Sequence, residues 1–206
     1  MAQPLGIVEI LGLTASISLL SGWRLYLCVL ATGIAMQLDI LPLPEHLASL
    51  RILANPWIMG TAAVAALCEF FADKVMWLDS VWDTIHTFIR PLGGALLALA
   101  VIDPGDPATQ AIAFILGGGA SLLAHGGKAG ARAVVNASPE PFSNAAVSTV
   151  EDVTTGGLLY LIFAYPLAAA LIAVLLLGIA IALLLAARRL IRHVFGRDRA
   201  PPAPKA

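Results

Sequence analysis

Long apolar stretches separated by short polar ones dominate the chain, and they predict helices that cross a membrane. The first apolar run covers about residues 5–36 and is interrupted at residues 21–24, which include Arg24, so that a tilted or broken helix fits it. The last run covers residues 153–187 without a charge. Each is longer than the roughly 20 residues that a helix needs to span a bilayer. Shorter apolar segments lie at 57–71, 93–102 and 109–124. We therefore expect an all-α, polytopic transmembrane bundle of about five spans, whose last run is one helix kinked at Pro166. Two helices in this run, and six spans, are the alternative.

The pattern becomes amphipathic between residues 69 and 91. Read as one helix ending at Pro91, this segment places its ionisable residues three and four positions apart on one face, with aromatic residues opposite. The polar face contains Glu69, Asp73, Asp79, Asp83, His86 and Arg90. A segment of this kind is typical of an interfacial or re-entrant helix.

Composition fixes the protein class. The chain has 206 residues, of which 59% are hydrophobic and only 12% are charged, whereas about a quarter of the residues of a soluble domain are charged. We therefore expect a lipid bilayer as the partner. The net charge of −1 gives no reason to expect nucleic-acid binding. Because Glu9 lies in the first apolar run and no Lys or Arg precedes it, we interpret this run as a membrane segment and not a cleaved signal peptide.

Five arginines follow the last apolar run, at positions 188, 189, 192, 197 and 199. The positive-inside rule then predicts a cytoplasmic C-terminus in the inner membrane. We expect residues 1–187 to form a single transmembrane domain. Residues 188–206 are predicted to be a basic end with a disordered, proline-rich tail.

Short matches between the two halves of the chain, 5–102 and 109–187, predict an inverted repeat. Residues 18–24 resemble 121–128, residues 69–73 resemble 140–144, and residues 81–83 resemble 150–152. Three spans between the copies would give them opposite orientations, as in many transporters with broken helices near the midplane. Chance resemblance within low-complexity apolar sequence is the alternative interpretation.

The segment HGGKAGAR carries three cationic or titratable residues at helical spacing. His125, Lys128 and Arg132 would share one helix face, while the neighbouring glycines allow the close approach of an anion or of another backbone. One interpretation is an anion-binding cradle that follows a helix break after Ala124. The other is a small-residue packing face between helices.

The segment SPEPFSN contains two prolines that prevent a continuous helix around Glu140. Irregular backbone at membrane depth occurs where it is buried in protein or lines a cavity. Glu140, with Asn144 nearby, would then be an ion ligand or proton carrier. An ordinary loop outside the membrane is the alternative. We interpret the pair at residues 151–152 as a helix cap.

Buried ion pairs explain the distribution of charges more simply than a metal site does. An unpaired Arg24 within an apolar span would cost several kcal/mol, so we expect it to face a carboxylate, water or protein. Carboxylates and imidazoles suit divalent cations, but no local ligand signature is present. We therefore predict no metal, no cofactor and no catalytic residue.

The segments EFFADKVMWLDSVWDTIHTFIRPLGGA and HGGKAGARAVVNASPEPFSN resemble an uncharacterised family of bacterial integral membrane proteins, domain-of-unknown-function family 4126. The resemblance extends to about Ala187. It implies an integral membrane protein and carries no activity with it.

The polar segments favour a small transporter or channel, assembled as a homo-oligomer, that handles an ion or a small anionic solute. The candidate site residues are Arg24, Glu69, Asp73, Asp83, His86, Arg90, His125, Lys128, Arg132, Glu140 and Asn144. We expect Glu69 and Glu140 to bind a coupling cation or proton, and the cations to attract the solute. Two alternatives stay open: a membrane enzyme acting on a lipid phosphate and a non-catalytic scaffold.

Overall fold

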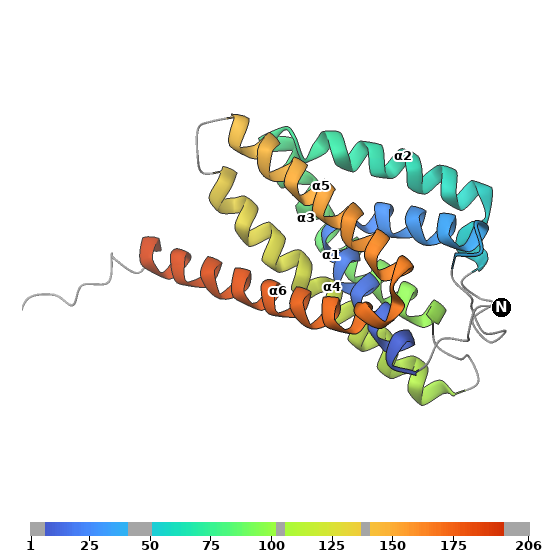
Figure 1. Ribbon diagram of the computed structural model, residues 1–206. Coiled ribbons are helices and arrows are strands. Elements are labelled where there is room, and N and C mark those ends of the chain that lie inside the picture. The colour runs from blue at the N-terminus through green and yellow to red at the C-terminus, as the bar shows by residue number, and fades with distance from the viewer. Residues whose placement is uncertain (1–6, 41–50, 102–105, 137–140, 196–206) are drawn as a thin grey trace, which may run out of the picture.

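Six helices follow one another in the computed structural model, which describes residues 7–40, 51–101, 106–136 and 141–195. Their bounds are α1 Ile7–Gln37, α2 Pro56–Ala72, α3 Met76–Val101, α4 Pro107–Asn136, α5 Pro141–Ala164 and α6 Pro166–Phe195 (Figure 1). No strand occurs among the described residues. The predicted all-α class is confirmed.

Four helices of the described chain, α1, α3, α4 and α6, are long and apolar enough to cross a membrane. The most apolar of them is α6, with a mean hydropathy of 3.0. Helix α2 is apolar but has 17 residues, slightly fewer than the roughly 20 of a full span. The chain is therefore a polytopic helical bundle of the membrane type.

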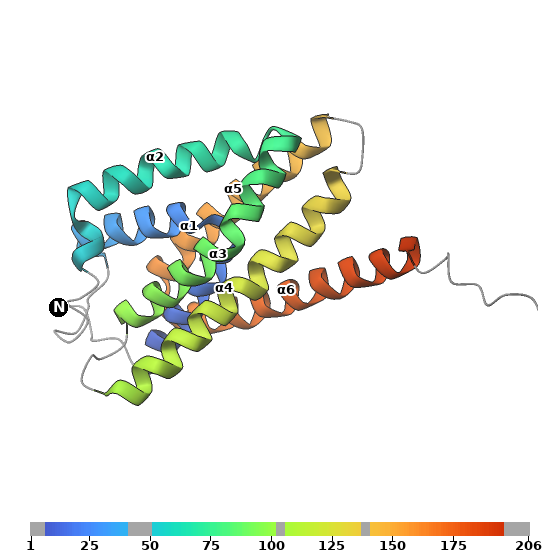
Figure 2. The ribbon, with the colours of Figure 1, turned by 180° about the vertical axis from the view of Figure 1, so that it is seen from behind.

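Helix α1 lies inside the bundle and packs against every other helix. Helix α5 passes in front of α1 in Figure 1, α2 runs above α1 in both views, and α3 and α4 lie in front of it in the reverse view of Figure 2. Helix α6 packs along α1 and α4. Polar side chains on α1 can therefore meet partners from several elements.

Close approach of α1 to α4 depends on Gly22. A Cβ atom at this position would lie 2.2 Å from the carbonyl oxygen of Ser121. The hydroxyl of Ser21 donates a hydrogen bond to the hydroxyl of Ser121 at 3.2 Å. Small residues and interhelical hydrogen bonds of this kind hold membrane helices together.

Helix α1 is kinked at Arg24, whose backbone angles of φ −143° and ψ 76° are not helical. The carbonyl oxygen of Trp23, beside the kink, accepts a hydrogen bond from Lys128 Nζ at 3.2 Å. The interruption predicted in the first apolar run is confirmed.

The prediction of one helix over residues 69–91 is wrong. Helix α2 ends at Ala72, and α3 starts at Met76 and continues through Pro91. The break is held by distant groups: Arg132 Nη2 and Asn144 Nδ2 donate hydrogen bonds to the Asp73 carbonyl oxygen at 2.9 and 3.0 Å. A carbonyl bound in this way does not need a helical partner.

The predicted helix break after Ala124 is also wrong, because α4 continues to Asn136. The glycines of its second half, at positions 126, 127 and 130, face α6. A Cβ atom at Gly127 would lie 3.0 Å from the Ala180 carbonyl oxygen, and one at Gly130 would lie 2.7 Å from the Ala187 Cβ atom. These glycines form the small-residue packing face of the second interpretation.

The last apolar run contains two helices, which is the alternative to the single kinked helix that the sequence favours. Helix α5 ends at Ala164 and α6 begins at Pro166. Proline lacks the amide hydrogen that continues a helix but fits its first turn. The predicted tail falls mostly on residues 196–206, outside the described residues.

Candidate functional site

Charged side chains form a buried layer where α1, α3, α4 and α5 meet the end of α2 and the α2–α3 connection. We call this the polar layer. It contains five cations, Arg24, Lys74, Arg90, Lys128 and Arg132, and six carboxylates, Glu69, Asp73, Asp79, Asp83, Glu151 and Asp152. All three guanidinium groups are at most 2% exposed.

Three cations surround the carboxylate of Asp73, which is completely buried. Arg24 Nη1 donates to Asp73 Oδ2, Lys128 Nζ lies 2.8 Å from the same oxygen and Arg132 Nη2 lies 3.4 Å from it. The cations come from α1 and α4, so this carboxylate joins α1, α4 and the end of α2. The cationic face predicted on α4 exists, and its occupant here is a carboxylate of the same chain.

Helix α5 supplies two further carboxylates to the same group. Arg24 Nη2 lies 2.8 Å from Asp152 Oδ1, and Lys74 Nζ lies 3.2 Å from Asp152 Oδ2. Glu151 lies 3.7 Å from Lys128 Nζ. These residues lie well inside α5, so our interpretation of them as a helix cap is wrong.

Arg132 completes this group and fixes the position of Asn144. Its Nη1 atom donates to Asn144 Oδ1 at 2.7 Å, and its Nη2 atom lies 3.2 Å from Asp79 Oδ1. We call the group the Asp73 cluster; it contains Arg24, Asp73, Lys74, Asp79, Lys128, Arg132, Glu151 and Asp152. Its four cations and four carboxylates balance when all are ionised.

Arg90 is the centre of a second group, the Arg90 cluster, formed with Glu69, Asp83 and His125. Arg90 Nη2 lies 2.7 Å from Glu69 Oε1, and Arg90 Nη1 lies 2.9 Å from Asp83 Oδ1. The same Nη1 atom lies 2.6 Å from His125 Nδ1. Arg90 has no exposed surface and Glu69 has 1%.

The hydrogen bonds fix the tautomer of His125. Arg90 can only donate, so His125 Nδ1 is the acceptor and carries no hydrogen. His125 Nε2 then donates to Thr87 Oγ1 at 3.0 Å, and the Thr87 hydroxyl donates to the Asp83 carbonyl oxygen at 2.9 Å. His125 is neutral in this arrangement.

The Arg90 cluster therefore has one cation for two carboxylates. Excess charge in a buried, low-dielectric site is costly unless a counter-ion or a proton neutralises it. Among the described residues, this cluster is the part of the polar layer whose charges do not balance.

His86 lies beside the Arg90 cluster and is held by uncharged groups. Its Nδ1 atom donates to the Trp82 carbonyl oxygen at 2.7 Å, and the Tyr26 hydroxyl donates to its Nε2 atom at 3.0 Å. The ring also stacks on Trp82 with 4.3 Å between ring centroids. These contacts give His86 a positioning role between α1 and α3.

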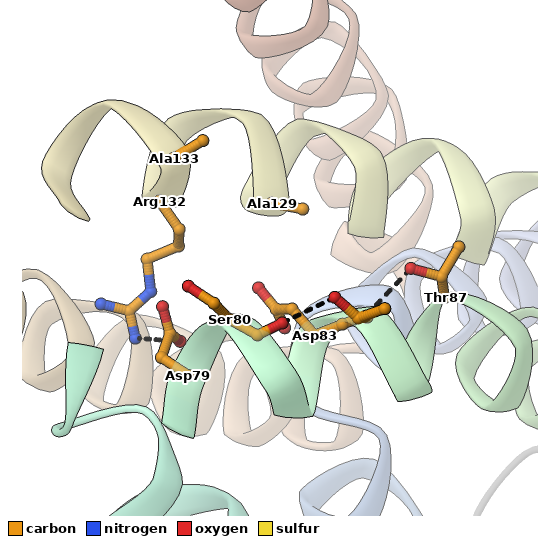
Figure 3. Close-up of a pocket in the computed structure, with 8 residues that line it drawn as sticks. Asp79, Ser80, Asp83, Thr87, Ala129, Arg132 and Ala133 are labelled. Carbon is orange, nitrogen blue, oxygen red and sulfur yellow. Dashed lines mark hydrogen bonds and ion pairs between the residues drawn. The ribbon is translucent and has the colours of Figure 1, made fainter. Parts of the chain in front are cut away.

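A cavity of 210 Å³ between α3 and α4 opens onto both clusters. Figure 3 shows Asp79 and Asp83 of α3 and Arg132 of α4 along this α3–α4 cavity. Thr87, the hydrogen-bond partner of His125, also lines it.

A second cavity, of 460 Å³, lies between α1 and α2 and reaches α5. Its charged lining residues are Arg24, Glu69 and Asp152. We call it the α1–α2 cavity. The two carboxylates bound to Arg90 therefore line different cavities: Glu69 lines this one and Asp83 lines the α3–α4 cavity.

The structure brings most of the predicted site residues together. Those that are described, Arg24, Glu69, Asp73, Asp83, His86, Arg90, His125, Lys128, Arg132 and Asn144, are all buried. They lie in the polar layer or beside it. Glu140 lies outside the described residues.

Sequence reasoning left four members of the Asp73 cluster out of the site: Lys74, Asp79, Glu151 and Asp152. A like-charge pair so close to an apolar run was the available signal for the last two. Within the described chain, no group of three or more His, Cys, Asp or Glu side chains is arranged to hold a metal ion.

A comparison with protein families shows the family of the chain. The model of a domain of unknown function, DUF4126, matches residues 11–186. The match covers most of the chain and all the described site residues, and the chain belongs to this family. Searches of curated proteins and of solved structures gave no significant match.

Proposed function

We propose that this member of the DUF4126 family is a proton-coupled membrane transporter whose coupling site is the Arg90 cluster. The observation that carries the proposal is the position of Arg90 between two carboxylates that line different cavities. Arg90 binds Glu69 at 2.7 Å and Asp83 at 2.9 Å. A proton that binds either carboxylate changes the partner of a buried cation.

Charge balance supports a proton or another monovalent cation as the coupling ion. With Glu69 and Asp83 ionised and His125 neutral, the Arg90 cluster carries one excess negative charge. One proton or one monovalent cation removes that excess. Protonation of Glu69 would weaken its ion pair with Arg90, and the guanidinium group would then pair with Asp83 alone.

The pairing of the cations favours a proton over an anionic solute as the coupled ion. Arg24, Lys128 and Arg132 converge on the carboxylate of Asp73. A lipid phosphate, as the enzyme hypothesis requires, would have to displace this buried carboxylate. These contacts therefore do not support the hypothesis of an enzyme that acts on a lipid phosphate.

Current measurements on proteoliposomes attached to a solid support test the proposal. We expect rapid proton-concentration jumps to produce transient currents in wild-type protein, and Glu69→Gln to abolish them, because glutamine cannot exchange a proton at pH 7. An unchanged current in Glu69→Gln would refute the assignment of the coupling site.

Asp106→Asn is the matched control. Asp106 is exposed and caps α4, accepting hydrogen bonds from the hydroxyl and amide of Thr109 and from the amide of Ala108. These hydrogen bonds, that of the Thr109 hydroxyl first, lower the pKa of the Asp106 carboxyl. Asparagine is an equally good cap, so this variant should retain the wild-type current and confirm that the loss in Glu69→Gln is specific.

A structural scaffold is the second candidate function. It is favoured by the pairing of every cation of the polar layer with at least one carboxylate. Under this hypothesis, correctly inserted wild-type protein gives no current after any proton-concentration jump. The only effect of Glu69→Gln is then a lower thermal stability.

Membrane placement and assembly belong to the same proposal. We place the protein in the inner membrane with the exposed, basic end of α6 in the cytoplasm.

The crossing of α1 and α4 at Gly22 and Ser121 supports the inverted repeat, because both positions belong to matched segments. In the other matched pair, residues 69–72 end α2 whereas residues 141–144 begin α5, so these two segments do not support the repeat. The repeat and the homo-oligomer stay predictions.

A further inference from the structure

The wall of the α1–α2 cavity is apolar. Leu27 and Leu30 contribute from α1, and Ala63, Ala66, Leu67 and Phe70 contribute from α2. Binding sites of this kind bury the apolar part of a ligand, while a few polar groups fix its orientation. The volume of 460 Å³ exceeds what a proton or a bare inorganic ion requires.

The charged lining of this cavity has a negative excess. Of its three charged residues, Arg24 and Asp152 pair with each other and belong to the Asp73 cluster, whose charges balance. Glu69 shares its partner Arg90 with Asp83, so its negative charge is only partly compensated. A ligand that neutralises this excess is a monovalent cation.

The lining also selects against inorganic cations. Hard cations such as Ca²⁺ require six or more oxygen ligands, whereas six of the nine residues that line the cavity are apolar. An apolar body around the positive charge fits that lining better, since it replaces lost hydration with apolar contacts.

We infer that the α1–α2 cavity binds a monovalent organic cation with an apolar body, which exchanges with a proton at Glu69. The inference rests on the proposed function and names the class of its substrate. Cation and proton neutralise the same excess charge, so they bind in alternation. This competition couples movement of the proton to movement of the cation in the opposite direction.

Binding of tetraphenylphosphonium to detergent-purified protein tests the inference by calorimetry, with tetraphenylborate as the comparison ion. The two ions have the same apolar body and opposite charge. We expect saturable binding of the phosphonium, release of about one proton per bound cation in weakly buffered solution, and no saturable binding of the borate. Equal binding of both ions would overturn the inference.

Two variants identify the site. Glu69→Gln should weaken phosphonium binding by at least about tenfold and abolish proton release. Ala66→Phe keeps the carboxylate but fills the cavity from α2, so it should weaken binding to a similar extent. Val64→Phe is the matched control, because Val64 is 62% exposed on the same helix and does not line the cavity.

The outcomes separate this inference from the proposed function. Unchanged phosphonium binding in both Glu69→Gln and Ala66→Phe overturns the organic-cation site. If the phosphonium does not bind while proton jumps still give Glu69-dependent currents, the inference fails and the proposed function stands. The inference is supported by currents that the phosphonium suppresses in wild-type protein and in Val64→Phe but not in Ala66→Phe.

Discussion

Asp73 illustrates how one buried carboxylate can organise a membrane bundle. Its side chain neutralises cations from α1 and α4, and its carbonyl oxygen accepts hydrogen bonds from Arg132 and Asn144. The residue therefore serves both as an ion-pair centre and as the end of α2. Removing its charge leaves the Asp73 cluster with four cations and only three carboxylates.

We expect Asp73→Asn to destabilise the protein by about 3–5 kcal/mol, the usual cost of breaking a buried ion pair. Thermal unfolding in detergent micelles measures this change. Asp106→Asn is again the control, since it removes a carboxylate from the exposed cap of α4 and should leave the melting temperature close to that of wild type. Equal melting temperatures for both variants would contradict the central role of Asp73.

At the residue scale, two kinds of signal predicted the buried cations. Arg24 was identifiable because an unpaired cation in a span is costly, and Lys128 and Arg132 were identifiable because their spacing places them on one helix face. The pair Glu151 and Asp152 was assigned to a cap, because nothing local reveals that their partners lie on α1 and α4.

Helix packing by small residues decides how closely the elements approach. Gly22 places α1 against the backbone of α4 at Ser121, where a Cβ atom would lie 2.2 Å from the carbonyl oxygen. The backbone of a packed helix cannot move aside without disturbing its other contacts. The position is therefore intolerant of any larger residue.

Gly22→Ala should destabilise the protein by about 1–3 kcal/mol, the range of overpacking in a well-packed interior. Gly119→Ala on α4 provides the comparison, because a Cβ atom there meets nothing within 4 Å. Removing a helical glycine should leave that variant as stable as wild type or slightly more stable. Equal melting temperatures for Gly22→Ala and Gly119→Ala would show that α1 and α4 can move apart at little cost.

At the element scale, hydrophobic runs predicted where helices occur but not where they end. The spacing across residues 69–91 is compatible with a continuous helix, yet α2 and α3 are separate. The groups that hold the break at Asp73 come from residues 59 and 71 positions later in the chain. Such long-range contacts leave no trace in local periodicity.

The whole molecule combines an apolar exterior with a charged interior. Large hydrophobic side chains on all six helices are exposed, as a lipid surrounding requires, while the polar layer connects elements far apart in the sequence. The α1–α2 and α3–α4 cavities reach this layer between different helix pairs. The proposed transport function depends on these two cavities, which reach the same charged layer.

Orientation in the membrane can be tested at this scale. Arg188, Arg189 and Arg192 are exposed at the end of α6, so we expect this end to face the cytoplasm. A green fluorescent protein fused after residue 206 should fluoresce, and alkaline phosphatase fused at the same place should be inactive. Active phosphatase together with absent fluorescence would reverse the orientation.

The distance in sequence between the members of the Asp73 cluster has a consequence for biogenesis. Arg24 leaves the ribosome 49 residues before Asp73 and 124 before Ser148, whose carbonyl oxygen it also contacts. A translocon that meets α1 alone must accept an arginine that costs about 2.5–3.5 kcal/mol near the helix centre. We therefore expect α1 to be stabilised in the membrane in two steps, first when Asp73 arrives at the end of α2 and then when α5 supplies Asp152.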